Sequence, residues 1–112
     1  MINVSIEISK SERCVRVTSS GHANDAPKGQ DTICAAVSTL IYGISKEFSM
    51  IDSERLIRQV VHMENGKVNI DLACADERIF RRILHNLAPF ERSMEVLAQD
   101  HPQAITLRNS VR

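Results

Sequence analysis

The sequence predicts a small α+β domain, in which a mostly antiparallel sheet packs against two helices in the order ββαββαβ. One pair of short segments alternates apolar with polar residues, a second pair is apolar-rich, and two longer segments carry apolar residues at helical spacing. At 112 residues and 43% hydrophobic composition, the chain is long enough for one modest core. We therefore expect residues 1–112 to form a single domain.

The first half of the chain is predicted to form a β-hairpin followed by a helix. Apolar residues alternate in residues 2–8 and 15–17, on either side of a turn-like segment, and residues 19–21 end the second strand. Within residues 33–48 the apolar side chains recur at the spacing of one buried helix face. A helix is therefore expected to run to about residue 48.

A second hairpin, a second helix and a short strand follow. Residues 56–63 and 67–73 are apolar-rich and flank an Asn-Gly pair, which favours hairpin turns because both turn positions need a positive φ. The next apolar stripe has Asp76 as its expected N-cap and continues past Pro89, which predicts one helix with a kink there. Residues 104–107 are expected to form a short closing strand.

Charge and composition argue against several classes of function. Fourteen basic and fourteen acidic residues give no net charge, so no overall field attracts the chain to nucleic acid or to anionic lipid. The N-terminal segment alternates like a strand rather than like a signal peptide, and no run of about 18 apolar residues suits a membrane span. We expect a cytoplasmic protein with no direct nucleic-acid partner and no membrane partner.

The three cysteines, Cys14, Cys34 and Cys74, are widely spaced and odd in number. This pattern fits neither a disulfide framework nor a structural zinc site, so reduced thiols and no metal site are expected. Cys14 and Cys74 lie in strand-like segments and are expected to be buried core residues. Cys34 opens an apolar run, and on spacing alone it too is more often a core residue than a functional one.

Cys34 also has a position that suits a nucleophile. If Asp31 is the N-cap, Cys34 lies in the first helical turn, where unpaired N–H groups and the helix dipole favour a thiolate. His22, twelve residues earlier at the end of the second strand, is a candidate general base. Ser38, one turn after Cys34, can hydrogen-bond the thiolate or the substrate, or instead the carbonyl of Cys34. Asp31 can act as a cap or as a partner of His22, and the sequence leaves both roles open.

The residues around this pair stand in a fixed order: Gly21, His22, Ala23, Gly29, Asp31 and the run Cys-Ala-Ala-Val-Ser at 34–38. This order resembles the signature of the ribosomal-processing cysteine proteases, the Prp family of bacteria. The resemblance covers essentially the whole chain, including the order of strands and helices. It departs from the family at residues 24–27, where family members carry an aromatic residue, and at Thr32, which replaces a branched aliphatic residue.

The resemblance implies a cysteine protease with a Cys/His dyad. Cys34 would be the nucleophile and His22 the general base. Asp31 and Ser38 would be supporting residues. No metal and no organic cofactor is implied.

The resemblance also implies a substrate and an assembly state. The implied substrate is the N-terminal extension of large-subunit ribosomal protein number twenty-seven, cut after a pair of phenylalanines, a step needed for ribosome assembly. Gly21 and Gly29 would be hinges of a loop that covers the bound peptide. The implied assembly is a homodimer.

Two other functions stay open at the level of the sequence. The first is a non-catalytic ribosome-associated binding module, in which Cys34 merely packs. The second is a redox-sensing thiol protein, which would need a reactive Cys34 but not His22. Thiol reactivity separates the first alternative from the protease, and replacement of His22 separates the second.

Overall fold

The computed structural model describes residues 1–21, 30–64 and 66–112, with the backbone alone at residues 30 and 31. The strands and helices follow the predicted ββαββαβ order, so the α+β prediction is confirmed. A short 3₁₀ helix at Ser53–Arg55 is the one addition within the described residues. The elements are β1 (Ile2–Ser9), β2 (Cys14–Ser20), α1 (Gln30–Ser49), β3 (Arg58–Glu64), β4 (Lys67–Ala73), α2 (Glu77–Asp100) and β5 (Ile105–Val111).

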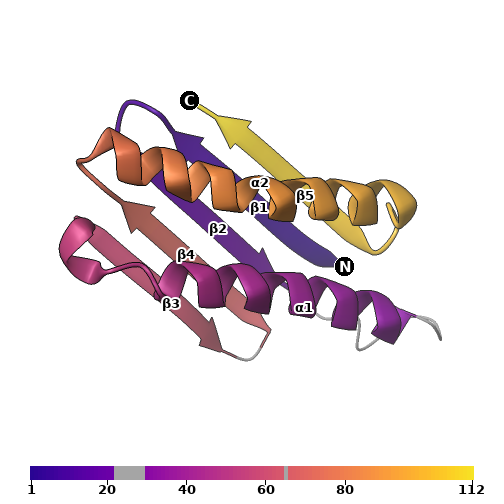
Figure 1. The fold of residues 1–112 in the computed structure, drawn as a ribbon. Coiled ribbons are helices and arrows are strands. Elements are labelled where there is room, and N and C mark those ends of the chain that lie inside the picture. Colours follow the sequence, from indigo (N-terminus) through magenta and orange to yellow (C-terminus); the bar gives the residue numbers. More distant parts are fainter. Residues whose placement is uncertain (22–29, 65) are drawn as a thin grey trace.

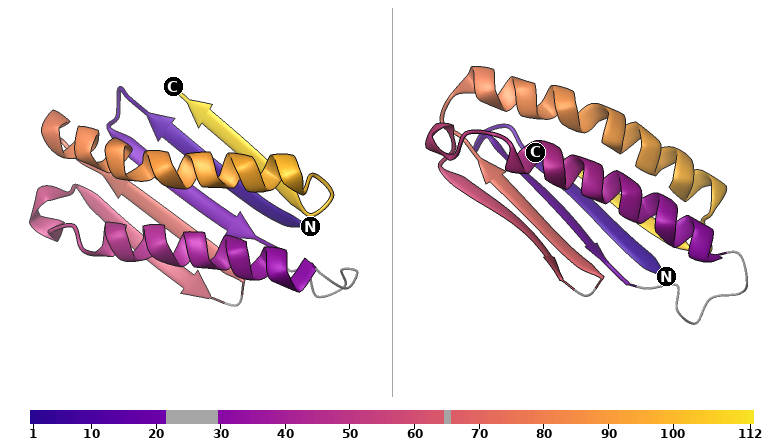
Figure 2. Two further views of the ribbon diagram at one scale, coloured as in Figure 1. Left: turned by 45° about the vertical axis from the view of Figure 1, so that its right-hand side comes forward. Right: turned by 60° about the horizontal axis from the view of Figure 1, so that its bottom comes forward.

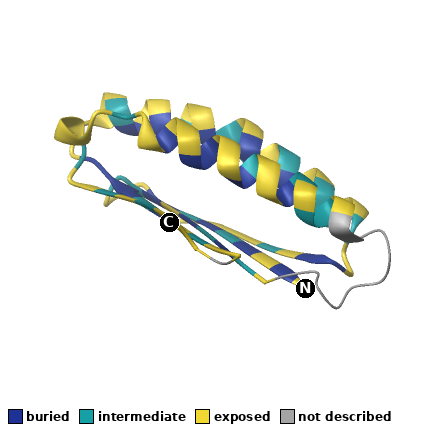
Figure 3. Cartoon of the chain, turned by 90° about the horizontal axis from the view of Figure 1, so that it is seen from below, coloured by how far each residue is buried: buried dark blue, intermediate teal, exposed yellow. Residues whose placement is uncertain are grey.

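The five strands form one sheet in the order β3-β4-β2-β1-β5 (Figure 1). The described pairs are antiparallel except for β1 and β5, which run parallel, so the sheet is mostly antiparallel as predicted. Both helices lie side by side over the same face of this sheet (Figure 2). The described residues therefore form two layers, and none of their helices lies on the second face of the sheet (Figure 3).

The core fills the space between the sheet and the two helices. Strand residues that point toward the helices alternate with residues that point away, and the helices bury side chains three and four positions apart. No helix of the described residues is long and apolar enough to cross a membrane. The largest side chains buried in this core include Phe48 of α1, Phe80, Ile83, Leu87, Phe90 and Met94 of α2, and Ile6, Val15, Val17, Ile70 and Leu72 of the sheet.

The start of α2 and its continuity through Pro89 follow the prediction, and the kink at Pro89 stays a prediction. Asp76 is the N-cap, and its carboxylate accepts a hydrogen bond of 2.7 Å from the backbone N–H of Arg78. Pro89 cannot donate a backbone hydrogen bond, yet α2 continues as one helix through it. Leu87 and Phe90 on either side are buried, and their packing offsets the lost bond.

The second hairpin is confirmed, with a later start than predicted. β3 and β4 pair antiparallel, and Gly66 in the turn has a φ of +77°. β3 begins at Arg58 because the preceding 3₁₀ helix is capped by Asp52, whose carboxylate accepts from the N–H of Glu54. β3 is an edge strand of the sheet, so the hairpin ends the sheet on this side.

The closing strand is longer than the sequence suggested. The prediction stopped at residue 107, whereas β5 continues to Val111 and pairs with β1 along its whole length. Arg108, Asn109 and Ser110 are polar and exposed because β5 is the other edge of the sheet. An edge strand with polar residues lacks the apolar alternation from which strands are predicted, so its full length is missed.

Candidate active site

Cys34 lines a pocket of about 410 Å³ that three parts of the chain enclose. The first part is the N-terminal half of α1, the second is the turn end of the β3–β4 hairpin, and the third is formed by the adjoining ends of β1 and β2. Its volume lies within the range of about 300–1,000 Å³ that is typical of ligand-binding pockets. The lining residues are Cys34, Val37, Ser38, Ile41 and Tyr42 from α1, Met63, Glu64, Gly66, Lys67 and Val68 from the hairpin, and Ile2, Ser19 and Gly21 from the strand ends.

The pocket wall formed by α1 carries a thiol, a hydroxyl and a phenol ring in a row. Cys34, Ser38 and Tyr42 are four residues apart, so they share one face of the helix at intervals of about 6 Å along its axis. Cys34 is half-buried, while Ser38 and Tyr42 are exposed. The structure thus brings Ser38 beside Cys34 on one helix face, as the sequence predicted.

Cys34 contacts both the core and the pocket. Its side chain packs against the hydrophobic core, and it also lines the pocket that opens to solvent. A role of Cys34 in core packing and a role as nucleophile are therefore compatible. A half-buried thiol in a pocket wall is held in place by packing while a substrate can still reach it.

Cys74 is a core residue as predicted. It is 1% exposed, and its thiol lies 3.7 Å from the carbonyl oxygen of Arg13. Burial raises the pKa of the Cys74 thiol, an effect that the nearby Arg13 guanidinium partly opposes. Cys74 does not line the pocket, so its neutral, buried thiol is suited to packing rather than to catalysis.

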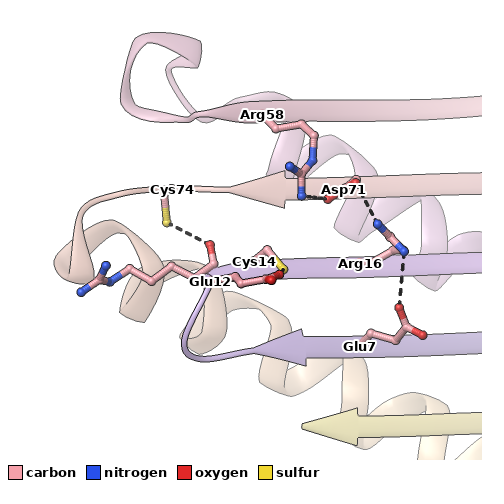
Figure 4. Close-up of polar contacts among 8 residues, drawn as sticks. Glu7, Glu12, Cys14, Arg16, Arg58, Asp71 and Cys74 are labelled. Atoms are coloured by element: carbon pink, nitrogen blue, oxygen red, sulfur yellow. Dashed lines mark hydrogen bonds and ion pairs between the residues drawn. The ribbon is translucent and has the colours of Figure 1, made fainter. Parts of the chain in front are cut away.

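The prediction that Cys14 is a core residue is wrong. Cys14 is half-buried on the face of the sheet that carries no helix, and its thiol lies 3.8 Å from a carboxylate oxygen of Glu12 (Figure 4). The physical reason is the two-residue period of a strand, because Val15 and Val17 point into the core and Cys14 must then point away. Cys14 lies outside the pocket of Cys34.

A row of charged residues crosses the helix-free face of the sheet (Figure 4). The Asp71 carboxylate pairs with Arg58 at 2.9 Å and with Arg16 at 3.4 Å, and Arg16 also lies 3.8 Å from Glu7. The hydrogen bond and charge of Asp71 raise the pKa of the Arg58 guanidinium. Each charge here has a partner on a neighbouring strand, so the row stabilises strand pairing and is separate from the pocket of Cys34.

The helix that carries Cys34 begins two residues earlier than predicted. α1 starts at Gln30, so Asp31 is the second helical residue rather than the N-cap before the helix, and Cys34 is the fifth residue rather than the third. The prediction erred because the helix dipole also stabilises an aspartate inside the first helical turn, so the presence of Asp31 does not fix where the helix begins. The side chain of Asp31 lies outside the described part of the chain, and its role stays a prediction.

Gly21 stands at the point where the chain leaves β2, as predicted. Its φ is +104°, in the region that favours glycine, and a Cβ placed there would overlap the carbonyl oxygen of Met1. Gly21 lines the pocket of Cys34, and His22 follows it in the sequence. His22 and Gly29 lie outside the described residues, so the Cys34–His22 dyad and the two glycine hinges stay predictions.

Tyr42, Met63, Glu64 and Lys67 are pocket residues that the sequence analysis did not identify. Tyr42 has a sequence signal, since it lies eight residues after Cys34 and so shares its helix face. The hairpin residues have no comparable signal, because their approach to α1 depends on the tertiary fold. Among the described residues, no group of three or more His, Cys, Asp or Glu is placed to hold a metal ion.

Solved structures of two bacterial proteins share this fold. A ribosomal processing protease Prp from Staphylococcus aureus in complex with a substrate peptide matches with a TM-score of 0.72 and 18% identity, over 98% of this chain and 100% of that one. The same protease with a covalently linked product peptide gives a TM-score of 0.70 and 21% identity, over 98% of this chain and 100% of that one. A protein from Streptococcus mutans gives 0.70 and 19% identity, over 100% and 96% of the two chains.

A family model agrees with this similarity of fold, although no single curated sequence does. No curated protein sequence matches the chain. The family model described as cysteine protease Prp matches residues 1–106, which is nearly the whole chain. The chain therefore belongs to the cysteine protease Prp family.

Proposed function

We propose that this protein is a cysteine endopeptidase that removes the N-terminal extension of large-subunit ribosomal protein number twenty-seven, cutting after a pair of phenylalanines. Membership of the Prp family supports the protease activity. The S. aureus protease of similar fold is a ribosomal processing protease that binds a substrate peptide, which supports this class of substrate.

The observation that carries the proposal is the position of Cys34 in its pocket. Its half-buried thiol lines a cavity of about 410 Å³, and Gly21, the residue before His22, bounds the same cavity. Because His22 directly follows Gly21, which bounds the pocket, the order of the chain supports His22 as the general base for Cys34. Nucleophilic catalysis needs such a base within hydrogen-bond reach of the thiol.

The proposed reaction has two covalent steps. His22 takes the thiol proton of Cys34, and the sulfur attacks the carbonyl carbon of the scissile peptide bond. The carbon–nitrogen bond then breaks, His22 gives its proton to the leaving amine, and a thioester to Cys34 remains. Water loses a proton to His22, attacks the thioester and releases the extension as a carboxylic acid, which restores the thiol. The covalently linked product peptide of the S. aureus protease supports a covalent step of this kind.

The other predicted residues have supporting roles in this proposal. The Ser38 hydroxyl, one turn after the thiol, hydrogen-bonds Cys34 or the peptide, and Asp31 stabilises either the helix start or the His22 imidazolium. Gly21 and Gly29 are the hinges of a loop over the peptide.

The rest of the proposal concerns the state in which the enzyme works. Residues 1–112 act as one protease domain, as a homodimer in the cytoplasm. Thiol and imidazole supply both the nucleophile and the proton transfers, so the reaction needs no metal and no organic cofactor.

Incubation with a peptide that spans the extension and its Phe-Phe junction tests the proposal, with mass spectrometry of the products. Wild type and Cys14→Ala should cut at one bond, whereas Cys34→Ala should leave the peptide intact while keeping the same circular dichroism spectrum. Cys14 is the matched control because it is a half-buried thiol outside the pocket. Cleavage by Cys34→Ala would refute the assigned nucleophile, and an intact peptide with wild type would favour the non-catalytic binding module.

A further inference from the structure

Basic side chains gather on one exposed face at the start of α2. Positions 78, 81, 82 and 85 are three or four residues apart, so their side chains are neighbours on the helix surface, and all of them are exposed. Arg55 of the 3₁₀ helix lines a pocket of about 360 Å³ together with Arg82, so the two elements contribute to one surface. We call this surface the arginine face, and its members are Arg55, Arg78, Arg81, Arg82 and His85.

Helix stability does not explain this placement. The N-terminal end of a helix carries a partial positive charge, so cations are disfavoured in the first turn and favoured in the last one. Arg78 lies in the first turn of α2, whereas the last turn of this helix contains no basic residue. Arg78 and Arg82 are also four residues apart, and like charges at this spacing destabilise a helix. Departures from local stability rules of this kind are typical of functional sites.

Three of these arginines, Arg55, Arg78 and Arg82, form no salt bridge within the described part of the chain. Arg81 lies 3.5 Å from Glu77, four residues before it on the exposed surface of α2. Exposed pairs of this kind contribute little to stability and are screened by salt. The guanidinium groups of the arginine face are therefore available to an anion from outside the chain.

The carboxylates beside the arginine face have other partners. Asp52 accepts the backbone N–H of Glu54 at 3.1 Å, and Asp76 caps α2. Glu47 accepts a hydrogen bond of 3.1 Å from the side chain of Asn86, and both line the pocket that Arg55 shares with Arg82. These acidic groups thus serve the helix starts and the contact between α1 and α2.

We propose that the arginine face binds the phosphate backbone of RNA. A guanidinium group presents its donors in a planar fork that matches the oxygens of a phosphate. Protein interfaces bury apolar and aromatic side chains at their centre, whereas interfaces with nucleic acid are polar and basic. The exposed large apolar side chain of α2 is Val96, near the other end of the helix, and Met50 is that of the pocket with Arg55 and Arg82. The arginine face therefore suits RNA better than an acidic protein.

The choice of RNA over DNA rests on the proposed function, because a ribosomal protein is made and assembled beside RNA. A net charge of zero led to the expectation of no nucleic-acid partner. Net charge describes an average over the whole chain, whereas contacts with phosphates depend on where the cations gather. Several arginines without an internal partner on one surface suffice for such contacts.

RNA on this face leaves the pocket of Cys34 open. Figure 1 shows the start of α2 and the 3₁₀ helix at one end of the molecule, and the N-terminal end of α1 at the other. The pocket with Arg55 and Arg82 is also lined by Met50, which directly follows the end of α1. Cys34 precedes Met50 by roughly 24 Å along the helix axis, at about 1.5 Å per residue. RNA binding and peptide cleavage therefore use separate ends of the molecule.

The test is the salt dependence of binding to a short fluorescein-labelled RNA duplex, followed by fluorescence anisotropy. If Arg55, Arg78 and Arg82 each neutralise one phosphate, the logarithm of the association constant should fall with that of the salt concentration at a slope of about −2.7. Affinity should then drop roughly 40-fold between about 50 and about 200 mM salt. Arg78→Gln/Arg82→Gln should bind more weakly, with a slope of about −0.9 and a drop of only about 3- to 4-fold.

The matched control is Arg16→Gln/Arg58→Gln, which removes the same charge from two arginines that pair with Asp71 on the helix-free face of the sheet. Its RNA affinity and salt slope should equal those of wild type. Glutamine is a good helix former, so the variant of α2 should keep the circular dichroism spectrum of wild type. Duplex DNA of the same sequence and poly-glutamate are the competing ligands.

Weaker RNA binding by Arg78→Gln/Arg82→Gln alone, with RNA bound by wild type at least as tightly as DNA, supports the proposal. No binding of RNA by wild type at the lowest salt concentration overturns it. Equal losses in the two double variants also overturn it, because they would reflect total charge rather than the arginine face. Tighter binding of DNA or of poly-glutamate rules out RNA as the partner. Peptide cleavage by wild type is measured separately, so its failure overturns the proposed function without affecting the binding result.

Discussion

Replacement of Gly21 by alanine should destabilise the protein markedly. Gly21 has a φ of +104°, and a residue with a side chain in a left-handed backbone conformation costs about 1–2 kcal/mol. The added Cβ would also overlap the carbonyl oxygen of Met1, which belongs to the backbone and cannot rotate away. Forcing a methyl group into such a contact costs about 1–3 kcal/mol, and the loss of unfolded-state freedom returns less than about 1 kcal/mol.

The net cost of Gly21→Ala is therefore about 2–4 kcal/mol, a large share of the roughly 5–15 kcal/mol that stabilises a domain of this kind. Each kcal/mol shifts Tm by about 4–8 °C in a domain of nearly this size, so Tm should fall by roughly 10 °C or more. Thermal unfolding followed by far-UV circular dichroism measures this shift. An unchanged Tm would show that the chain relaxes at this point without cost and would refute the reasoning.

Gly43→Ala is the matched control, because the same chemical change should act in the opposite direction. Gly43 lies in the middle of α1, and apart from its chain neighbours and the backbone of its own helix no atom lies within 4 Å of a Cβ added there. Alanine in a helix is more stable than glycine by about 0.5–1 kcal/mol, so Tm should rise by a few degrees. A fall in Tm with Gly43→Ala would mean that backbone conformation and steric space do not govern the effect at either site.

Three further predictions concern titratable residues. His22→Ala should lower the rate of peptide cleavage by about 10²–10⁴, and the wild-type rate should follow a bell-shaped pH profile; near-normal turnover of the variant would contradict the dyad. The Arg13 guanidinium, 2.8 Å away, lowers the pKa of Glu77. A lowered folded-state pKa stabilises the protein above the unfolded pKa, and this stability is lost as pH falls through the folded value. Wild type should thus exceed Glu77→Gln in Tm at neutral pH, and the gap should close in acid, whereas a gap independent of pH would argue against the pair. Because burial raises the pKa of Cys74, iodoacetamide should alkylate this thiol most slowly of the three in the folded protein, and equal rates would contradict its assignment to the core.

The elements that the sequence predicted well are those whose pattern is local. In the first hairpin, Val15 and Val17 alternate with polar residues because one face of β2 is covered by helices. The stripe of α2 is equally local, and its cap at Asp76 follows from the preference of an aspartate oxygen for unpaired N–H groups. Such patterns show which face of an element is buried, so they predict the element even when the elements packed against it are unknown.

The errors occurred where residue type was followed in place of strand geometry. The end of β5 was missed because Arg108 and Asn109 are polar on an edge strand, although their backbones pair with β1. Cys14 was placed in the core by residue type, when the parity of Val15 already required it to face the other side. Residue preference was the weaker argument in both cases, and strand geometry was the stronger one.

The candidate site was predicted only where its pattern is local. Cys34 and Ser38 lie one turn apart on α1, a relation that helix period alone gives, and Tyr42 continues the same row. Met63 could not be predicted, because its place opposite α1 depends on how the hairpin packs. A site formed by one helix is readable from sequence, whereas a site formed by a helix and a hairpin needs the fold.

The central claim is that Cys34 is the nucleophile, and a covalent trap tests it most directly. A peptide that ends in Phe-Phe and carries a vinyl sulfone in place of the scissile bond should add to the attacking thiol, and mass spectrometry after digestion locates the adduct. We predict one adduct per chain, on Cys34, with none formed by Cys34→Ala and less formed when the unmodified substrate peptide competes. An adduct on Cys14 or Cys74, or equal labelling of all three thiols, would contradict the account.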